Sequence, residues 1–245
     1  MSDQNVQDLE LSDAELLEVL KNHGVNRRSL MKVFGAGAAV SVLGSTAAAA
    51  KGSGRGHRID KVYGAPYAAG DGVPSGLVDH EVMLHVHEED IHADFPIDPE
   101  SGEEIPAEFF FNPVGLHVNP GDIVQFHTHN GLHTATSFHP KFSEPPFFEA
   151  PQRVPTDYGF TSPPITNDDS WLYRFTEPGV YDLLCLPHLE LGMVMRIVVS
   201  GDGNVPTEDY GSLSIPNAGD VLDAPELTPS SIVTEGMIEW EDLTL

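Results

Sequence analysis

Three side chains able to bind a soft metal stand close together in the last third of the chain: Cys185, His188 and Met193. They lie in the segment YDLLCLPHLELGMVMRIVV at residues 181–199, where a short connection joins two apolar runs. Thiolate and thioether sulfur select soft metals, and imidazole binds many transition metals. The spacing therefore predicts a binding loop for a soft, redox-active metal, with one further histidine supplied from elsewhere.

The chain has a single cysteine. This count excludes an intramolecular disulfide, a zinc finger with several cysteines and an iron–sulfur cluster held by several thiolates. The alternative is an inert, buried cysteine that packs as a small apolar side chain. That alternative leaves the neighbouring Pro187-His188 and Gly192-Met193 pairs unexplained. Two histidines and one cysteine with a distant axial methionine are typical of a blue-copper electron-transfer site.

These residues resemble the copper loop of plastocyanin- and halocyanin-like cupredoxins. The resemblance extends over about residues 78–200 and includes the segments 111–126 (FNPVGLHVNPGDIVQF) and 171–181 (WLYRFTEPGVY). It places His133 where the family has its first histidine ligand. It implies one type 1 copper per chain, bound by His133, Cys185, His188 and Met193, with Thr134 and Leu186 beside the sulfur.

The resemblance also implies a function, which is the transfer of single electrons between redox proteins and not an enzymatic reaction. Partners would dock near His188, on an apolar patch of Leu132, Pro187, Leu189 and Leu191 that contains the acidic Glu190. Respiratory membrane complexes or a terminal oxidase are the partners that we expect. We expect a monomer, and we expect no small-molecule substrate.

The pattern of short apolar runs and turn residues predicts an all-β fold, a cupredoxin-like Greek-key β-sandwich of about 7–8 strands. We predict a twin-arginine signal peptide at 1–50, a Gly-rich linker at 51–78, the cupredoxin domain at 79–200 and an acidic extension at 201–245. Residues 80–87 and 194–199 read as strands. An insertion at about 88–107 should border the copper site, and residues 231–240 could add a strand.

The charge is strongly negative: 38 Asp and Glu residues against 12 Lys and Arg give a net charge of -26. Nucleic acids and anionic lipids need clustered basic residues, so neither is an expected partner. The acids are scattered, as on proteins adapted to high salt. At about 1 M salt the Debye length is about 3 Å, which would screen their repulsion. We therefore hypothesise a halophilic source.

The first fifty residues predict export. The segment 26–32 (NRRSLMK) resembles a twin-arginine motif, and an apolar, alanine-rich stretch follows it. We expect a protein that is secreted or held at the outer face of the cell membrane, anchored there if the N-terminus stays uncleaved.

Other donors leave alternatives open. Met195 is a rival to Met193 as axial ligand, although its spacing does not fit the motif. Five histidines could form a second metal site: His85, His87, His92, His127 and His129. Such a site would favour a copper enzyme or a copper-storage protein. Copper enzymes with two wired centres place histidine next to the cysteine, whereas leucines flank Cys185 here.

Overall fold

The computed structural model describes residues 59–87, 108–143, 148–201 and 204–245. The predictions for the signal peptide at 1–50, for the insertion at about 88–107 and for His92 lie outside the described residues.

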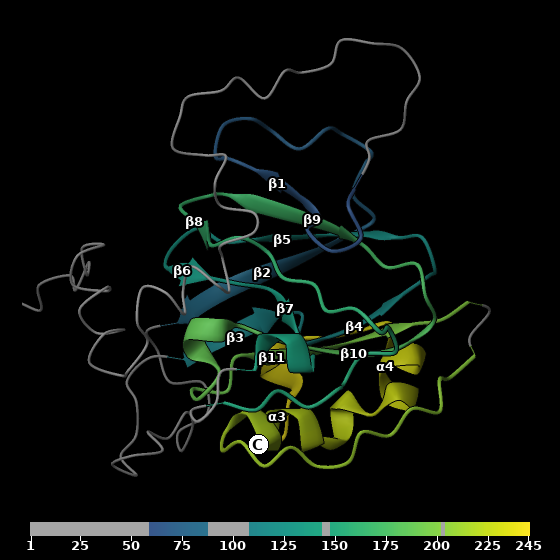
Figure 1. Ribbon diagram of the computed structural model, residues 1–245. Coiled ribbons are helices and arrows are strands. Elements are labelled where there is room, and N and C mark those ends of the chain that lie inside the picture. Colours follow the sequence, from purple (N-terminus) through teal and green to yellow (C-terminus); the bar gives the residue numbers. More distant parts are fainter. Residues whose placement is uncertain (1–58, 88–107, 144–147, 202–203) are drawn as a thin grey trace, which may run out of the picture. The chain divides into compact units, whose positions relative to one another are not determined.

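The first sheet contains five strands, and the strand at residues 80–87 lies next to one of its edge strands (Figure 1). Its order is β1 (Ala65–Tyr67), β9 (Ser170–Arg174), β5 (Ile123–His127), β2 (His80–His87) and β3 (Glu108–Asn112). The β2–β5 pair is parallel and the other pairs are antiparallel. On β2 the buried residues alternate, since Val82 and Leu84 are fully buried and Met83 between them is not. This period of two is the pattern of a strand with one face on the core.

The second sheet also contains five strands and holds the two strands that flank the metal-binding loop. Its order is β12 (Met237–Ile238), β4 (Gly115–Val118), β11 (Val194–Val199), β10 (Gly179–Leu184) and β7 (Thr136–Ser137). Only β4–β11 is parallel. A separate two-stranded ladder joins β6 (Leu132–His133) to β8 (Ile165–Thr166).

The two sheets enclose one hydrophobic core, to which strands of both sheets contribute. This arrangement confirms the predicted all-β sandwich. The two sheets hold ten strands among the described residues, more than the seven or eight predicted. The two additional edge strands come from segments outside the predicted domain: β1 from the predicted linker and β12 from the C-terminal extension.

The C-terminal extension covers the face of the second sheet that points away from the first sheet (Figure 1). It contains two α-helices, of which α3 packs on β11 and α4 packs on β4. Its elements are α3 (Ala218–Asp223), the 3-10 helix η4 (Pro225–Leu227), α4 (Pro229–Glu235), β12 and the 3-10 helix η5 (Trp240–Asp242). Every residue of β10 and β11 is therefore buried. The segment 231–240 does add a strand, but only at Met237–Ile238, because its first residues belong to α4.

A buried charge cluster joins the extension to the sheet. Asp182 of β10 is fully buried and accepts from Arg153 Nε at 2.8 Å, from Arg196 Nε at 2.7 Å and from Arg196 Nη2 at 3.0 Å. The same arginines donate to carbonyl oxygens of the extension: Arg153 to Gly211 at 2.8 Å and Arg196 to Leu227 at 2.9 Å. The cluster thus pairs the buried charges and also holds the extension on the sheet.

None of the helices among the described residues is long and apolar enough to cross a lipid bilayer.

Candidate metal centre

Four donor atoms predicted from the sequence meet at one end of the sandwich. Cys185 Sγ lies 3.8 Å from His133 Nδ1 and 3.4 Å from His188 Nδ1. Met193 Sδ lies 3.3 Å from His133 Nδ1. Among the described residues, His133, Cys185 and His188 are the one group of three or more His, Cys, Asp and Glu side chains whose donor atoms lie close enough together to hold a metal ion.

The connection between β10 and β11 brings three of these residues together. Cys185 directly follows β10, and Met193 directly precedes β11. The backbone N–H of Cys185 donates to the Met193 carbonyl at 2.9 Å, which closes the base of the loop. His188 ends the 3-10 helix η3 (Leu186–His188), which has Pro187 in its first turn. The short loop therefore brings the thiol, the imidazole and the thioether close together.

His133 comes from a different part of the chain, at the end of β6. Its strand pairs with β8, where His133 is opposite Ile165. His133, Cys185 and Met193 are all 0% exposed, whereas His188 is partly exposed. The site is thus closed on three sides and reaches the surface through one imidazole.

Burial keeps these donors uncharged when no metal is bound. It raises the pKa of the Cys185 thiol to about 12 and lowers the pKa of His133 to about 4. Burial, followed by the nearby His133, lowers the pKa of His188 to about 3. Neutral imidazoles present lone pairs to a metal, and a buried thiol becomes a thiolate only when a cation replaces its proton. Two imidazole nitrogens, a thiol and a thioether at a largely buried point fit a copper ion.

Threonines beside the sulfur fix its position, as predicted for Thr134. The backbone N–H of Thr134 donates to Cys185 Sγ at 3.3 Å, and Thr134 Oγ1 accepts from the Leu186 N–H at 2.9 Å. Thr136 Oγ1 donates to Thr134 Oγ1 at 3.2 Å. A hydrogen bond to the sulfur stabilises a thiolate and tunes the metal bound to it. The two hydrogen bonds of Thr134 with Cys185 and Leu186 also link the loop to the β6–β7 segment.

The partly exposed His188 stacks on Phe109, with ring centroids 4.2 Å apart and planes 24° apart. Phe109 lies at the start of β3, next to the end of the predicted insertion. Nothing in the local sequence singles out Phe109 for this contact, because a contact between two distant segments leaves no local pattern. Around this edge Pro187 is exposed, and Leu132 and Leu191 are partly exposed. Leu189 is only 7% exposed and belongs to the core, so its place in the predicted surface patch is wrong.

The rival donors do not join this site. Met195 is fully buried within β11 and belongs to the hydrophobic core. His85 stacks on Phe110 at 5.1 Å between ring centroids, and His129 Nδ1 pairs with Asp168 at 2.7 Å. The ring of His127 lies 6.0 Å from that of His129, edge to face. Within the described ranges these histidines do not form a second donor cluster.

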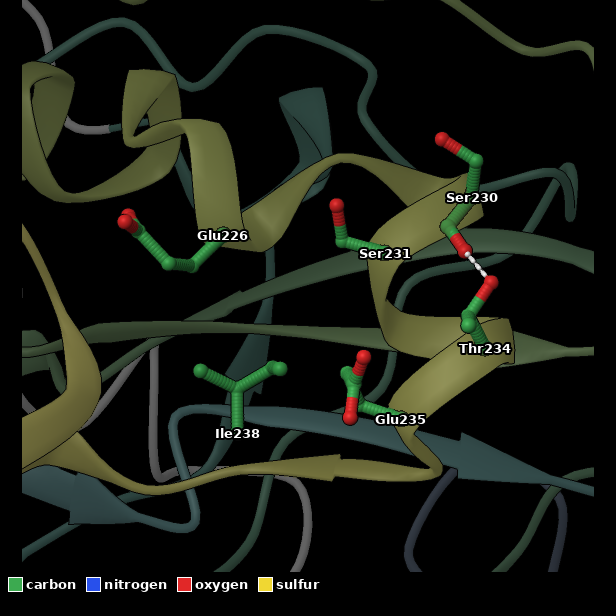
Figure 2. Close-up of a pocket in the computed structure, with 6 residues that line it drawn as sticks. All are labelled: Glu226, Ser230, Ser231, Thr234, Glu235 and Ile238. Atoms are coloured by element: carbon green, nitrogen blue, oxygen red, sulfur yellow. Dashed lines mark hydrogen bonds between the residues drawn. The ribbon is translucent and has the colours of Figure 1, made fainter.

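A separate pocket lies on the C-terminal extension (Figure 2). It is lined by side chains of η4, α4 and β12: Glu226, Ser230, Ser231, Thr234, Glu235 and Ile238. Thr234 Oγ1 donates to the Ser230 carbonyl there at 2.7 Å. The polar side chains that line it are carboxylates and hydroxyls, with no imidazole and no sulfur. It does not contain any of the predicted copper ligands.

Comparisons with solved structures find cupredoxins. An amicyanin variant in its reduced Cu(I) form at pH 4 is 20% identical, with a TM-score of 0.33, over 56% of this chain and 92% of that chain. Pseudoazurin from Hyphomicrobium denitrificans is 20% identical, with a TM-score of 0.37, over 59% of this chain and 92% of that chain. A purple cupredoxin from Nitrosopumilus maritimus is 20% identical, with a TM-score of 0.32, over 50% of this chain and 100% of that chain.

No protein-family model matches the sequence, and no curated protein matches it.

Proposed function

We propose that this protein is an exported type 1 blue-copper protein that carries single electrons between redox partners by cycling one copper between Cu(I) and Cu(II). The observation that carries the proposal is the convergence of Cys185 Sγ, two histidine Nδ1 atoms and Met193 Sδ at one buried point. When bound there, copper would supply a one-electron redox couple whose potential depends on the thiolate and the axial thioether.

The protein's own residues would keep the site's geometry unchanged during electron exchange. The loop is closed at its base by the Cys185–Met193 backbone hydrogen bond, and Thr134 fixes the sulfur from the opposite side. His133 is enclosed in the core. Donors held in this way need little rearrangement, which keeps the cost of changing the oxidation state small.

The proposed exchange point is His188, the ligand that reaches the surface. Exposed Pro187 and partly exposed Leu132 and Leu191 surround it, and such an apolar area suits a transient contact with another protein. Exposed Glu190 adds a negative charge that would help to select the partner. A membrane respiratory complex or a terminal oxidase is the proposed partner, with the carrier as a monomer at the outer face of the membrane or secreted.

Two features of the sequence support the location and the environment. The twin-arginine-like segment at 26–32 supports export, and the net charge of -26 supports a protein that works in high salt. Residues 88–107 are proposed to border the copper site, because Phe109, just beyond their end, contacts His188.

The test is the copper content, visible spectrum and voltammogram of the full chain loaded with Cu(II) in high salt. We expect one copper per chain, an intense thiolate-to-copper band in the red region and a reversible one-electron wave. The Cys185→Ser variant should lose the band. A weak spectrum typical of nitrogen and oxygen ligands, or two or more coppers per chain, would instead support a copper enzyme or a storage protein.

A matched pair of methionine variants tests the axial ligand. Met193→Leu should change the reduction potential and the visible spectrum, because it removes the sulfur 3.3 Å from His133 Nδ1. Met195→Leu, two residues along and equally buried, should leave both unchanged. Equal effects of the two changes would exclude Met193 as the axial ligand.

A further inference from the structure

The C-terminal extension reaches the metal-binding loop at Asn217. Its side-chain amide Nδ2 donates to the backbone carbonyl of Glu190 at 2.8 Å. Glu190 lies between two proposed ligands, His188 and Met193. A residue of the C-terminal extension is thus hydrogen-bonded to the middle of the loop.

The hydrogen bonds of the loop explain why an external donor matters there. The Cys185 carbonyl accepts from the N–H of His188 at 3.2 Å, and the His188 carbonyl accepts from the N–H of Leu191 at 3.2 Å and of Met193 at 3.1 Å. The Leu189 carbonyl accepts from the Gly192 N–H at 3.1 Å. The Glu190 carbonyl, in contrast, receives its hydrogen bond from Asn217, so the outer turn of the loop is held from outside.

Asn217 is held firmly enough to act as such a support. It is only 4% exposed and adopts φ 58° and ψ -57°, a conformation that favours glycine over residues with a side chain. Backbone strain of this kind persists only where the surrounding structure enforces it. The chain leading into Asn217 passes close to Gly219 of α3, where a Cβ atom would collide with the Leu213 carbonyl.

The support is attached to the strand that leaves the metal site. Asn217 directly precedes α3, whose Ala218, Val221 and Leu222 are buried, and α3 packs on β11. β11 begins at the residue after Met193. The outer turn of the loop and the strand at its base are therefore connected through a single packed unit, α3 (Figure 1).

We infer that Asn217 is a positioning residue for the metal-binding loop: its amide fixes the turn at Glu190 and thereby the approach of His188 and Met193 to the site. The consequence for copper rests on the function proposed above, whereas the effect on the loop does not. The extension thus helps to position the metal-binding loop, in addition to covering the sheet.

The experiment measures amide hydrogen exchange of the metal-free full chain in the wild type and in Asn217→Gly. Glycine accepts the positive φ, so this change removes the donor and relieves the backbone strain together. We expect the amides of Leu191, Gly192 and Met193 to exchange about fivefold faster, the equivalent of one net hydrogen bond of ordinary strength. The protection of the β11 amides against exchange should not fall below its wild-type value, and neither should the unfolding midpoint.

The matched control is Asn204→Gly. Asn204 is an exposed asparagine of the same extension, and its amide donates to the Gly201 carbonyl at 3.2 Å, away from the loop. The Asn204→Gly variant should leave amide exchange in the metal-binding loop unchanged. Asn217→Asp, which places a carboxylate against the Glu190 carbonyl, should accelerate loop exchange at least as much as Asn217→Gly.

A second readout follows the metal. In the copper-loaded chain, Asn217→Gly should shift or broaden the thiolate-to-copper band and the electron paramagnetic resonance signal, and Asn204→Gly should not. Unchanged loop exchange in Asn217→Gly would overturn the inference, and so would accelerated exchange with an unaltered copper spectrum. If the wild type gives no such band, the proposed function fails, and the exchange experiment alone decides the role of Asn217.

Discussion

Replacing Asp182 by asparagine should strongly destabilise the protein, although the two side chains have nearly the same shape. Asp182 is 0% exposed and is the shared partner of two buried arginines, Arg153 and Arg196. The change removes the carboxylate that both buried guanidinium groups share. It also turns one acceptor oxygen into an amide that faces N–H donors.

The size of the effect follows from the three contacts at 2.7 to 3.0 Å. Hydrogen bonds to charged groups contribute about 1.5–3 kcal/mol each, but contributions that share one partner do not add. Removing one member of a buried ion pair costs about 3–5 kcal/mol, and we expect Asp182→Asn to lower the free energy of unfolding by this amount. With a urea m-value of about 2–3 kcal/mol/M, the midpoint should fall by about 1–2.5 M.

The assay is urea unfolding in high salt, followed by the fluorescence of the two tryptophans, Trp171 in the sandwich and Trp240 in the extension. Single-tryptophan backgrounds would report the two parts separately. Because the arginines also bond carbonyls of the extension, the Trp240 signal should change first. The control is Asp157→Asn at an exposed site, where we expect a change within about 0.5 kcal/mol. A loss below about 1 kcal/mol in Asp182→Asn would refute the reasoning, since an unpaired buried charge cannot cost so little.

Three further predictions concern the extension and the metal-free site. Trp240→Ala should cost about 3–5 kcal/mol in urea unfolding, because the fully buried indole stacks on Phe110 at 5.0 Å; an unchanged midpoint would mean that the extension is not part of the cooperative fold. His133 alone should cost the metal-free chain about 3 kcal/mol of stability as the pH falls from 6.5 to about 4, because the unfolded chain protonates this group first; His188, whose pKa is lowered to about 3, adds a further loss over the same range, and His133→Gln should abolish only the first part in denaturation curves. The Cys185 thiol, with its pKa raised to about 12, should resist a thiol reagent at pH 8 in the native metal-free chain and react after unfolding, whereas rapid native labelling would contradict its burial.

The local parts of the site could be predicted from the sequence because they depend on spacing alone. Cys185, His188 and Met193 lie in one short connection, so their order in the chain already places them together. The strands β2 and β11 have the predicted bounds, because alternating apolar residues in the first and a run of β-branched and apolar residues in the second predict a strand directly. His133 needed the family resemblance, since nothing in its local sequence distinguishes it from His127 or His129.

The remaining features depend on contacts between distant segments. Asp182 and Arg196 interrupt apolar strands and would read as solvent-facing residues, yet they are buried partners because the extension covers that face of the sheet. Phe109 lies against His188, and Asn217 bonds the carbonyl of Glu190, across long stretches of chain. The sequence by itself determined the donor types, their loop and the sandwich class, because these follow from local spacing and hydrophobic period. Only the tertiary structure decided which distant residues hold the loop in place, because such contacts depend on how the sheets and the extension pack.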